Sequence, residues 1–467
     1  MGALAESKRI EVRMPNFERI STLPFSRVET FAWHKRPGAL ARFTPPWQQV
    51  ELVRKVGGLE TGSEVEFKMK LGPVWKTWLA RHTDYEEGRL FRDIQIEGPF
   101  AAWDHQHIFE DAPEGCRYID RIVYSAPLSL DFFSGSINGE LDRAFLYRHQ
   151  TLLNDLSAAK QSQLKSPKRI LISGATGLVG RALCAFLQVS GHDVCILTRR
   201  KPTAPHEIFW NPEEAISNLS ALEGFDAVIH LAGENISGSR WTPEVKERLY
   251  SSRINSTRHL VDALGKLSSK PKTFICASAV GFYGDRGSEL LDEGSKAGTN
   301  FLAKICIDWE QEAQRAESFG IRSAQMRIGV VLSPSGGALQ KMLTPFRLGI
   351  GGSLGPGTQF MSWIGLDDLI YSVAYVLGHE NLSGPINAVS PEASDFMTFA
   401  KTLAQCLHRP LGPSIPAFAL KTLAGELAEQ LLLASIRVHP KKLLDAGFSF
   451  SQPHLMSVFQ HLLGKSS

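Results

Sequence analysis

Alternating polar and apolar positions dominate residues 10–150. The stretches EVEFKMKL, RLFRDIQIEG and CRYIDRIVYS are separated by Gly and Pro and predict antiparallel strands. VETFAWHKRPGALARF, at 28–43, predicts a short helix pair, and ELDRAFLYRHQTLLNDLSAA, at 140–159, has apolar residues at helical spacing. Residues 1–160 are therefore expected to form an α+β domain, a curved sheet closed by a long helix.

The pattern changes at Arg169. Near-continuous apolar runs (RILISG, DVCILT, DAVIHLAG, KTFICAS and RSAQMRIGVVL) follow one another, with helical stretches between several of them. This order is typical of an α/β fold, a doubly wound Rossmann-type parallel sheet covered on both faces. We expect a linker at 161–168, the sheet domain at 169–380, and a C-terminal cap at 381–467.

The most informative motif lies between the first apolar run of this domain and the helix after it. Glycines at three-residue spacing permit a tight turn and close backbone approach, and the helix N-terminus directs free N–H groups at a pyrophosphate. The strand before the turn and the second strand about 20 residues on are the context that such a site needs. The predicted cofactor-binding residues are Gly174, Ala175, Thr176, Gly177, Leu178, Val179 and Gly180.

The residues after the second strand indicate which dinucleotide is bound. An NAD site would offer Asp or Glu to the ribose 2′-hydroxyl, but the chain reads Thr198-Arg199-Arg200-Lys201. Three cations without a carboxylate suit a 2′-phosphate, so Arg199 and Arg200 are predicted to select NADP(H). A solvated basic loop is the alternative interpretation.

A set of further motifs carries a family resemblance across 169–460. They are GATGLVG, HLAGENI, RW, SSRINST, SAVGFYG, FLAKICIDWE, RIGVVLS, GGSLGPGTQFMSWI and HPKKLLDAGFSF. The chain thus resembles extended short-chain dehydrogenases/reductases of the NAD-dependent epimerase/dehydratase superfamily, in the atypical branch with the bacterial YfcH-type proteins and the human 39U member. The resemblance implies that Leu231, Ala232 and Gly233 line the adenosine side. Longer members of that branch carry an N-terminal domain resembling the START/polyketide-cyclase (SRPBCC) group, a helix-grip fold around an apolar cavity.

The resemblance breaks at the usual catalytic pair. Such reductases use a Tyr and a Lys four residues later, on one face of the helix after the fifth strand. Aligning Glu310 with the family's glutamate puts Leu302 and Cys306 at those positions. A shifted register that uses Lys304 places Asn300 at the tyrosine position, so neither alignment supplies a phenol.

Two residues are candidates for the missing chemistry. Ser278 ends the fifth strand, where such enzymes present the hydroxyl that polarises a carbonyl. Tyr283 follows in the loop and is a candidate proton donor, with a binding or packing role as the alternative. Cys306 is interpreted as a small core residue rather than a nucleophile.

Three residues are candidates for the substrate side. Arg253 falls near the position of the family's Asn that organises a water, and a guanidinium there could hold an acidic substrate or the pyrophosphate instead. A surface salt bridge is the alternative. Arg240 and Trp241 match the branch's own signature, where a cation and an aromatic invite a planar ligand; Trp241 as a lid anchor is the alternative.

The N-terminal domain is rich in aromatic residues and has one histidine pair. A cavity wall for an apolar small-molecule ligand and an ordinary core are the two interpretations of the aromatic set. Because His105 and His107 lie two apart, they share a face of a strand, but no third ligand is evident and no metal is expected. The aromatic residues are Trp33, Trp47, Trp75, Trp78, Phe91 and Trp103.

The composition of the chain argues against some classes of binding partner. The 467 residues carry a net charge of +3 without a long Lys/Arg run, which disfavours nucleic acid as a partner. The six cysteines are scattered without a C-x-x-C, which favours a reducing, cytoplasmic compartment. No apolar stretch is long enough to span a bilayer, and the opening MGALAESKRIEVR has no signal-peptide core, so no membrane partner is expected.

Two functions follow from these observations. The first is an NADP(H)-dependent oxidoreductase or epimerase-like enzyme acting on a small molecule, with Ser278 and Tyr283 nearest the chemistry. The second is a non-catalytic NADPH-dependent sensor coupled to a hydrophobic-ligand-binding N-terminal domain. Retention of the cofactor motif is compatible with both, and the missing Tyr/Lys pair favours the second.

Overall fold

The computed structural model describes residues 15–126 and 134–465 and divides into two compact units. The first unit comprises residues 1–35 and 48–150, and the second comprises 36–47 and 151–467. The chain therefore passes between the units near residues 35, 47 and 150. The expected single division at residue 160 differs from this in two places, because residues 151–160 and the segment 36–47 both belong to the second unit.

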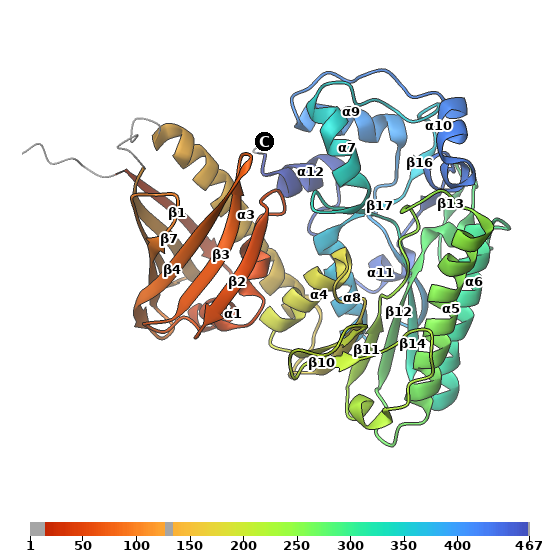
Figure 1. The fold of residues 1–467 in the computed structure, drawn as a ribbon, viewed down its shortest axis with the longest axis horizontal. Helices are drawn as coiled ribbons and strands as arrows, with labels where there is room; N and C mark the ends of the chain where they lie inside the picture. The colour runs from red at the N-terminus through yellow and green to blue at the C-terminus, as the bar shows by residue number, and fades with distance from the viewer. Residues whose placement is uncertain (1–14, 127–133, 466–467) are drawn as a thin grey trace, which may run out of the picture. The chain divides into compact units, whose positions relative to one another are not determined.

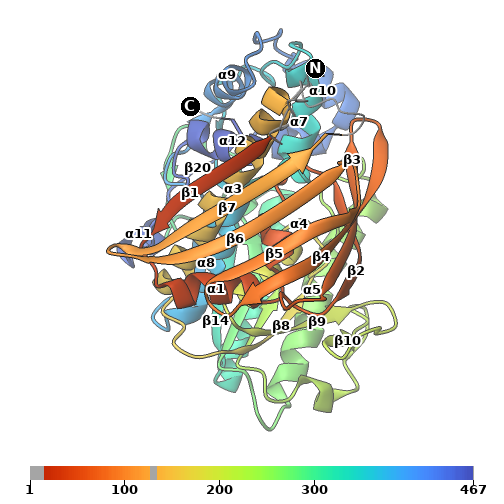
Figure 2. The ribbon, with the colours of Figure 1, turned by 90° about the vertical axis from the view of Figure 1, so that its left-hand side faces the viewer.

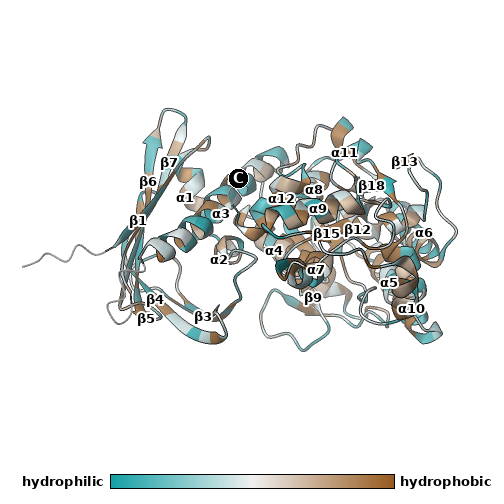
Figure 3. Ribbon diagram, turned by 90° about the horizontal axis from the view of Figure 1, so that it is seen from above, coloured by the Kyte–Doolittle hydropathy of each residue, from teal (hydrophilic) through white to brown (hydrophobic). Residues whose placement is uncertain are grey.

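The first unit is built on one antiparallel sheet of seven strands in the order β1-β7-β6-β5-β4-β3-β2 (Figure 2). Figure 3 shows this sheet edge-on, with α1 and the start of the long helix α3 on the same side of it. The three strands expected from alternation are β3, β5 and β7. The elements are β1 (Asn16–Leu23), α1 (Arg27–Lys35), β2 (Val50–Val56), β3 (Glu64–Leu71), β4 (Val74–Glu86), β5 (Leu90–Glu97), β6 (Ala102–Ala112), β7 (Gly115–Ser125) and α3 (Ser134–Gln161).

The side of the sheet that faces α3 holds two kinds of residue. Alternate positions of β6 are buried, and Trp103 belongs to an aromatic cluster with Phe17, Trp78 and Phe145. Further along the same strand, His105 and His107 are buried as well. The six aromatic residues considered together from the sequence do not form one wall, because Trp75 is 41% exposed and Trp47 belongs to the second unit.

The second unit contains a seven-stranded parallel sheet in the order β10-β9-β8-β11-β12-β14-β18. Figure 1 shows α4 and α8 on one face of it and α5 and α6 on the other. The doubly wound sheet is as expected, and its strand order reverses between β8 and β11. Its elements are β8 (Arg169–Ser173), α4 (Leu178–Val189), β9 (Asp193–Thr198), β10 (Glu207–Phe209), β11 (Ala227–His230), α5 (Pro243–Gly265), β12 (Thr273–Ala279), α6 (Phe301–Gln314), β14 (Arg322–Ile328), α8 (Leu366–Gly378) and β18 (Gly384–Ala388).

The C-terminal segment is continuous with this sheet. Because the edge strand β18 lies at 384–388, the sheet extends into the range that the sequence assigned to the cap. One helix before β18 in sequence and two helices after it share one apolar cluster. The remaining elements are α7 (Gly337–Arg347), α9 (Phe396–Cys406), α10 (Ala417–Ala424), α11 (Lys441–Asp445), α12 (Leu455–Leu463) and the short strand pairs β13 (Leu290–Leu291) with β20 (Arg437–Val438), β15 (Val330–Leu332) with β17 (Trp363–Gly365), and β16 (Phe360–Met361) with β19 (Ser394–Asp395). Within the described ranges no helix combines the length and the apolar character that crossing a membrane requires.

A buried ion cluster ties the segment 36–47 to the second unit. Arg42, on α2 (Ala39–Phe43), lies 2.6 Å from Asp155 of α3 and 2.8 Å from Asp367 of α8. Tyr371 donates to Asp155 at 2.7 Å, and His461 of α12 contacts Asp367 at 3.0 Å. One guanidinium thus pairs with carboxylates from two helices.

The Arg42 cluster generates a stability prediction. Arg42→Met leaves both buried carboxylates uncompensated, so we expect the free energy of unfolding to fall by about 3–5 kcal/mol, measured by urea denaturation of the full chain. The control Arg258→Met removes a half-exposed pair with Glu312 and should cost about 1 kcal/mol or less. Equal losses in the two variants would contradict the role assigned to Arg42.

Candidate functional site: a cavity at the carboxyl ends of the parallel strands

The glycine turn between β8 and α4 brings three stretches of backbone close together. Gly174 has φ +72°, and a Cβ on it would lie 2.7 Å from the carbonyl carbon of Leu231. A Cβ on Gly180 would lie 2.2 Å from the Gly174 carbonyl oxygen. Only glycine fits at either position, and α4 consequently begins directly over the end of β8.

A cavity of about 1010 Å³ opens beside this turn. Its size is at the upper end of the range of about 300–1,000 Å³ for small-molecule sites. It lies at the strand-order reversal, where open α/β sheets bind ligands. The lining residues come from the turn, the end of β9, the loop after β10, the loop after β11 and helix α5: Gly174, Thr176, Gly177, Leu197, Thr198, Arg199, Arg200, Trp210, Pro212, Glu213, Leu231, Ala232, Gly233, Glu234, Asn235, Arg248, Ser251, Ser252 and Asn255.

The structure thus brings together most of the cofactor-binding residues that the sequence predicted. Leu178, Val179 and Gly180 form the first turn of α4, and Ala175 is buried beneath the turn. The N–H groups of that first turn have no partner within the helix, and the helix dipole favours an anion there. The site can hold a phosphate group at one end of an extended ligand.

Arg199 and Arg200 are both exposed at the rim of the cavity. Arg200 lies 3.5 Å from Glu207, a long surface pair that contributes little free energy. The backbone N–H of Arg200 donates to the Thr198 hydroxyl at 3.3 Å, which fixes the bend after β9. Both guanidinium groups are therefore placed where they can bind an anionic group of a ligand in the cavity.

A buried polar chain supports the floor of the cavity. The Ser173 hydroxyl oxygen accepts from the backbone N–H groups of Leu231 and Ala232, at 3.2 and 3.3 Å. Its own proton is then available to His230 Nδ1, 2.6 Å away. Burial lowers the pKa of His230 to about 3, so the imidazole stays neutral. Sequence reasoning missed Ser173 and His230; their positions at the last residues of β8 and β11 were the available signal.

Arg253, Trp241 and Arg240 do not appear among the cavity-lining residues. Arg253 donates to the carbonyl oxygens of Leu249 and Glu234, at 3.0 and 2.8 Å, and its guanidinium lies beside Gly233. The Arg253 side chain therefore links the loop after β11 to helix α5, and its charge is not directed into the cavity. Trp241 donates to the Ile236 carbonyl at 3.0 Å and is buried in the core. Arg240 is exposed near Gly425.

Tyr283 is fully buried, and this placement corrects its expected position beside the chemistry. Its hydroxyl donates to Asn387 at 2.7 Å and accepts from Arg327 at 3.0 Å. Burial raises the pKa of Tyr283 to about 12, although Arg327 opposes the rise. The phenol therefore positions Arg327 and Asn387, the packing role that the sequence left open.

Ser278 begins the same buried network and is only 3% exposed. Its hydroxyl donates to Glu310 at 2.7 Å, and Glu310 forms a bidentate pair with Arg327 at 2.8 and 2.9 Å. The path from Ser278 through Glu310 and Arg327 to Tyr283 joins β12, α6 and β14. Ser278 is thus held in a fixed orientation near the end of its strand, with its hydroxyl proton directed to Glu310, and it is not among the residues that line the cavity.

Helix α6 carries the residues of both alternative registers. Leu302 and Cys306 are buried on one face of the helix, and burial raises the pKa of Cys306 to about 12. That thiol stays protonated near neutral pH, as expected for a core residue. In the shifted register, Asn300 caps the helix by accepting from Ala303, and Lys304 is an exposed partner of Asp308 at 2.8 Å.

Comparison with known proteins identifies the family. The model of the NAD dependent epimerase/dehydratase family matches residues 170–388, and that of DUF1731, a domain of unknown function, matches 415–462. Epimerase family protein Mb2239 of Mycobacterium bovis is 39% identical over 281 residues, which are 60% of this chain and 93% of that protein. The chain belongs to the NAD-dependent epimerase/dehydratase family.

Two solved structures of the epimerase family are similar to the chain. The nucleoside-diphosphate sugar epimerase from Corynebacterium glutamicum is 33% identical with a TM-score of 0.79, and the match covers 96% of this chain and 90% of that one. Human epimerase family protein SDR39U1 (isoform 2), crystallised with NADPH, is 30% identical with a TM-score of 0.57, covering 63% of this chain and 98% of that one. The epimerase resemblance read from the sequence is confirmed at this level.

The glycine turn generates a prediction with a matched pair of variants. Gly180→Ala forces a Cβ into the Gly174 carbonyl, so we expect a loss of about 1–3 kcal/mol in unfolding free energy, seen as a lower thermal midpoint. Gly177→Ala should cost less, because φ is −75° there and the nearest atom lies 3.2 Å from the added Cβ. A larger loss for Gly177→Ala would contradict the packing described for α4.

Proposed function

We propose that this epimerase-family protein binds NADP(H) in the cavity at the ends of β8, β9 and β11. The observation that carries the proposal is the placement of Arg199 and Arg200 on the rim of the same cavity as the glycine turn. The first turn of α4 would hold the pyrophosphate, and the two guanidinium groups the 2′-phosphate. The NADPH in the crystal structure of human SDR39U1, a relative of 30% identity, supports this choice of dinucleotide.

Each part of the cavity has a task in this proposal. Leu231, Ala232 and Gly233 would lie along the adenosine, and their backbone is held by Ser173 and, through Glu234, by Arg253. Arg200 would exchange its long contact with Glu207 for the phosphate, a stronger charge-assisted hydrogen bond. When bound, NADPH supplies a hydride.

Replacing both rim arginines tests the choice of dinucleotide. We expect Arg199→Ala/Arg200→Ala to weaken NADPH binding at least about tenfold, because each lost bond to a charged group is worth about 1.5–3 kcal/mol, and to leave NADH binding nearly unchanged. Binding is measured by titration calorimetry with each dinucleotide. Arg117→Ala, on an exposed arginine of β7, is the matched control.

Equal loss of NADPH and NADH in the double variant would refute 2′-phosphate recognition. Failure of the unaltered protein to bind either dinucleotide would refute the cavity assignment as a whole.

The reaction we propose is oxidoreductase or epimerase-like chemistry on a small molecule, with Ser278 as the hydroxyl on the substrate side. Its support is the place of Ser278 near the carboxyl end of β12, at the edge of the sheet where open α/β folds bind ligands. In this role its hydroxyl proton would turn from Glu310 to the substrate. Nucleotide-sugar epimerisation, suggested by the name of the Corynebacterium glutamicum structure, fits less well, because the sequence alignment through Glu310 predicts Leu302 and Cys306 at the positions of the family's Tyr and Lys.

A non-catalytic NADPH-dependent sensor is the second candidate. Two observations favour the sensor. Leu302 and Cys306 on α6 are buried apolar side chains, and Tyr283 is buried as well. In this role, dinucleotide binding alone would change how the chain holds a ligand or a partner.

A turnover assay distinguishes the two candidates. The full chain is incubated with NADPH and a panel of aldehydes and ketones, while NADPH absorbance and NADPH binding are followed together. We expect oxidation of NADPH with at least one carbonyl compound and its loss in the Arg199→Ala/Arg200→Ala variant. Saturable binding without turnover of any compound would refute the enzyme and support the sensor.

For the first unit we propose a START/polyketide-cyclase-like helix-grip domain that holds an apolar small molecule. Its support is the seven-stranded antiparallel sheet with α3 on one side, and the aromatic cluster of Phe17, Trp78, Trp103 and Phe145 between them. A reducing, cytoplasmic compartment stays a prediction from the sequence.

A further inference from the structure

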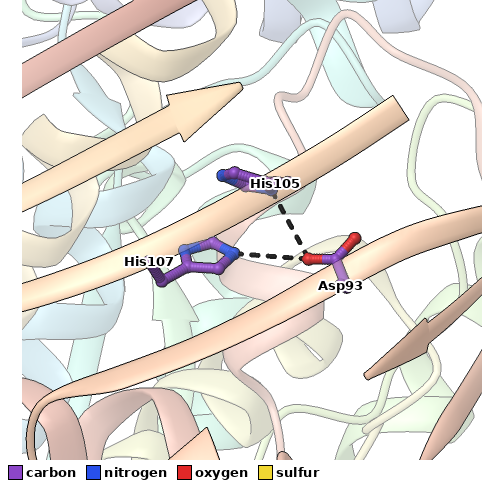
Figure 4. Close-up of side chains that lie close together, drawn as sticks. All are labelled: Asp93, His105 and His107. Atoms are coloured by element: carbon purple, nitrogen blue, oxygen red, sulfur yellow. Dashed lines mark ion pairs between the residues drawn. The ribbon is translucent and has the colours of Figure 1, made fainter. Parts of the chain in front are cut away.

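A buried cluster of a carboxylate and two imidazoles lies in the first unit. It consists of Asp93 on β5 and His105 and His107 on β6, with side chains 14%, 6% and 9% exposed. Figure 4 shows the two imidazoles and the carboxylate pointing toward one another. The sequence showed the histidine pair but no third ligand. The third group comes from the β5–β6 pairing, in which Asp93 lies opposite His105.

The distances suit a shared ion. His105 Nδ1 lies 3.6 Å and His107 Nε2 lies 3.7 Å from Asp93 Oδ2. All three ligand atoms lie within 4.8 Å of one another. Two ligand atoms that each lie about 2.1 Å from a tetrahedral ion are about 3.4 Å apart, so a small inward shift of these side chains completes the site.

The opposite edges of both imidazoles are held by one buried carboxylate. Asp120 lies 2.9 Å from His105 Nε2 and 2.7 Å from His107 Nδ1. It also contacts His149 Nε2 at 2.8 Å and accepts from the Tyr118 hydroxyl at 2.9 Å. An ionised Asp120 carries no proton and can only accept hydrogen bonds, so each histidine donates an N–H to it.

This arrangement fixes what the histidines offer to Asp93. Although burial lowers the pKa of His107, Asp120 and Asp93 raise it overall, so its Nε2 can carry a proton toward Asp93 in the metal-free chain. A bound metal ion displaces such a proton, and each imidazole then donates an N–H to Asp120 and offers a lone pair from its other nitrogen. His105 Nδ1, His107 Nε2 and the Asp93 carboxylate are then three electron-pair donors that face one another. Metal-binding histidines are oriented in this way by a carboxylate on the far nitrogen.

Aromatic side chains and one cation complete the surroundings. Phe91 stacks on His107 with ring centroids 4.0 Å apart, and Phe145 meets His105 edge-on at 5.3 Å, so both rings are fixed. Arg148 interacts electrostatically with Asp93 and Asp120. With the imidazoles neutral, as they are when they bind a metal ion, two carboxylates and one guanidinium leave one formal negative charge, which favours a cation at the centre.

We propose that Asp93, His105 and His107 bind a divalent first-row transition-metal ion, with Zn²⁺ as the ion best suited to two imidazoles and one carboxylate. Three protein ligands leave a coordination position open, as in zinc sites that bind a water or a substrate oxygen. The open position would take an oxygen ligand. We expect that position on the side of Asp93, which is the least buried of the three residues. The site is independent of the dinucleotide cavity of the second unit.

Metal binding by the unaltered chain is the first test. The full-length protein is stripped with a chelator and titrated with Zn²⁺ by calorimetry and with Co²⁺ by visible absorption. We expect one equivalent to bind with micromolar or tighter affinity, and Zn²⁺ to raise the thermal midpoint because only the folded chain has the site. Absence of saturable binding would overturn the proposal, and a proton would then occupy the space between the imidazoles and Asp93.

Variants locate the bound ion. Asp93→Asn keeps the side-chain shape but removes a charged ligand, so Zn²⁺ affinity and the thermal shift should be lost. Asp120→Asn should weaken binding by about 10–100-fold through misorientation of the histidines. His454→Asn, which removes an exposed histidine paired with Glu392 in the second unit, is the control and should bind as the unaltered chain does. Full affinity in Asp93→Asn, or loss in His454→Asn, would place the ion elsewhere and overturn the assignment.

Discussion

The second unit depends on how closely helix α4 approaches the backbone around it. A Cβ added to Gly180 would lie 2.2 Å from the Gly174 carbonyl oxygen. A Cβ added to Gly174 would lie 2.7 Å from the carbonyl carbon of Leu231, at the start of the loop after β11. On its far side α4 meets Gly38, where a Cβ would lie 2.5 Å from the Ala185 carbonyl oxygen. Backbone contact on two sides of one helix fixes its first turn over β8. The cavity, its phosphate-binding end and the docking of the segment 36–47 all follow from that placement.

The two units use buried charge in different ways. In the second unit, Arg42 meets Asp155 and Asp367 in a closed set in which each carboxylate also has a second partner, Tyr371 or His461. In the first unit, Asp120 collects hydrogen bonds from three imidazoles and a phenol, which leaves the outer edges of two histidines directed at Asp93. A closed set of charges stabilises the packing of helices, whereas an open set creates an affinity for a further cation. This contrast separates the structural cluster from the candidate site.

Local features of the fold and site were predictable from the sequence, and long-range ones were not. The glycine turn at 174–180 and the arginines at 199 and 200 sit within about 30 residues, so strand, turn and helix periodicity locate them. Tyr283 was misplaced because its partner Asn387 is 104 residues away, on a strand that the sequence assigned to a cap. Asp93 was missed because only the pairing of β5 with β6 brings it to His105. Register between strands is set by tertiary packing, which spacing along the chain does not encode.

The position of Arg42 has a consequence for how this polypeptide is divided. The polar stretch at 161–168 looks like a natural place to cut, yet a fragment that begins there omits α2 and most of α3. Such a fragment would retain Asp367 without its guanidinium, and would expose the surface of α4 that Gly38 covers. A stretch inside the first 50 residues thus belongs to the same compact unit as a sheet that begins at residue 169. The functional boundary of the dinucleotide-binding unit is discontinuous along the chain.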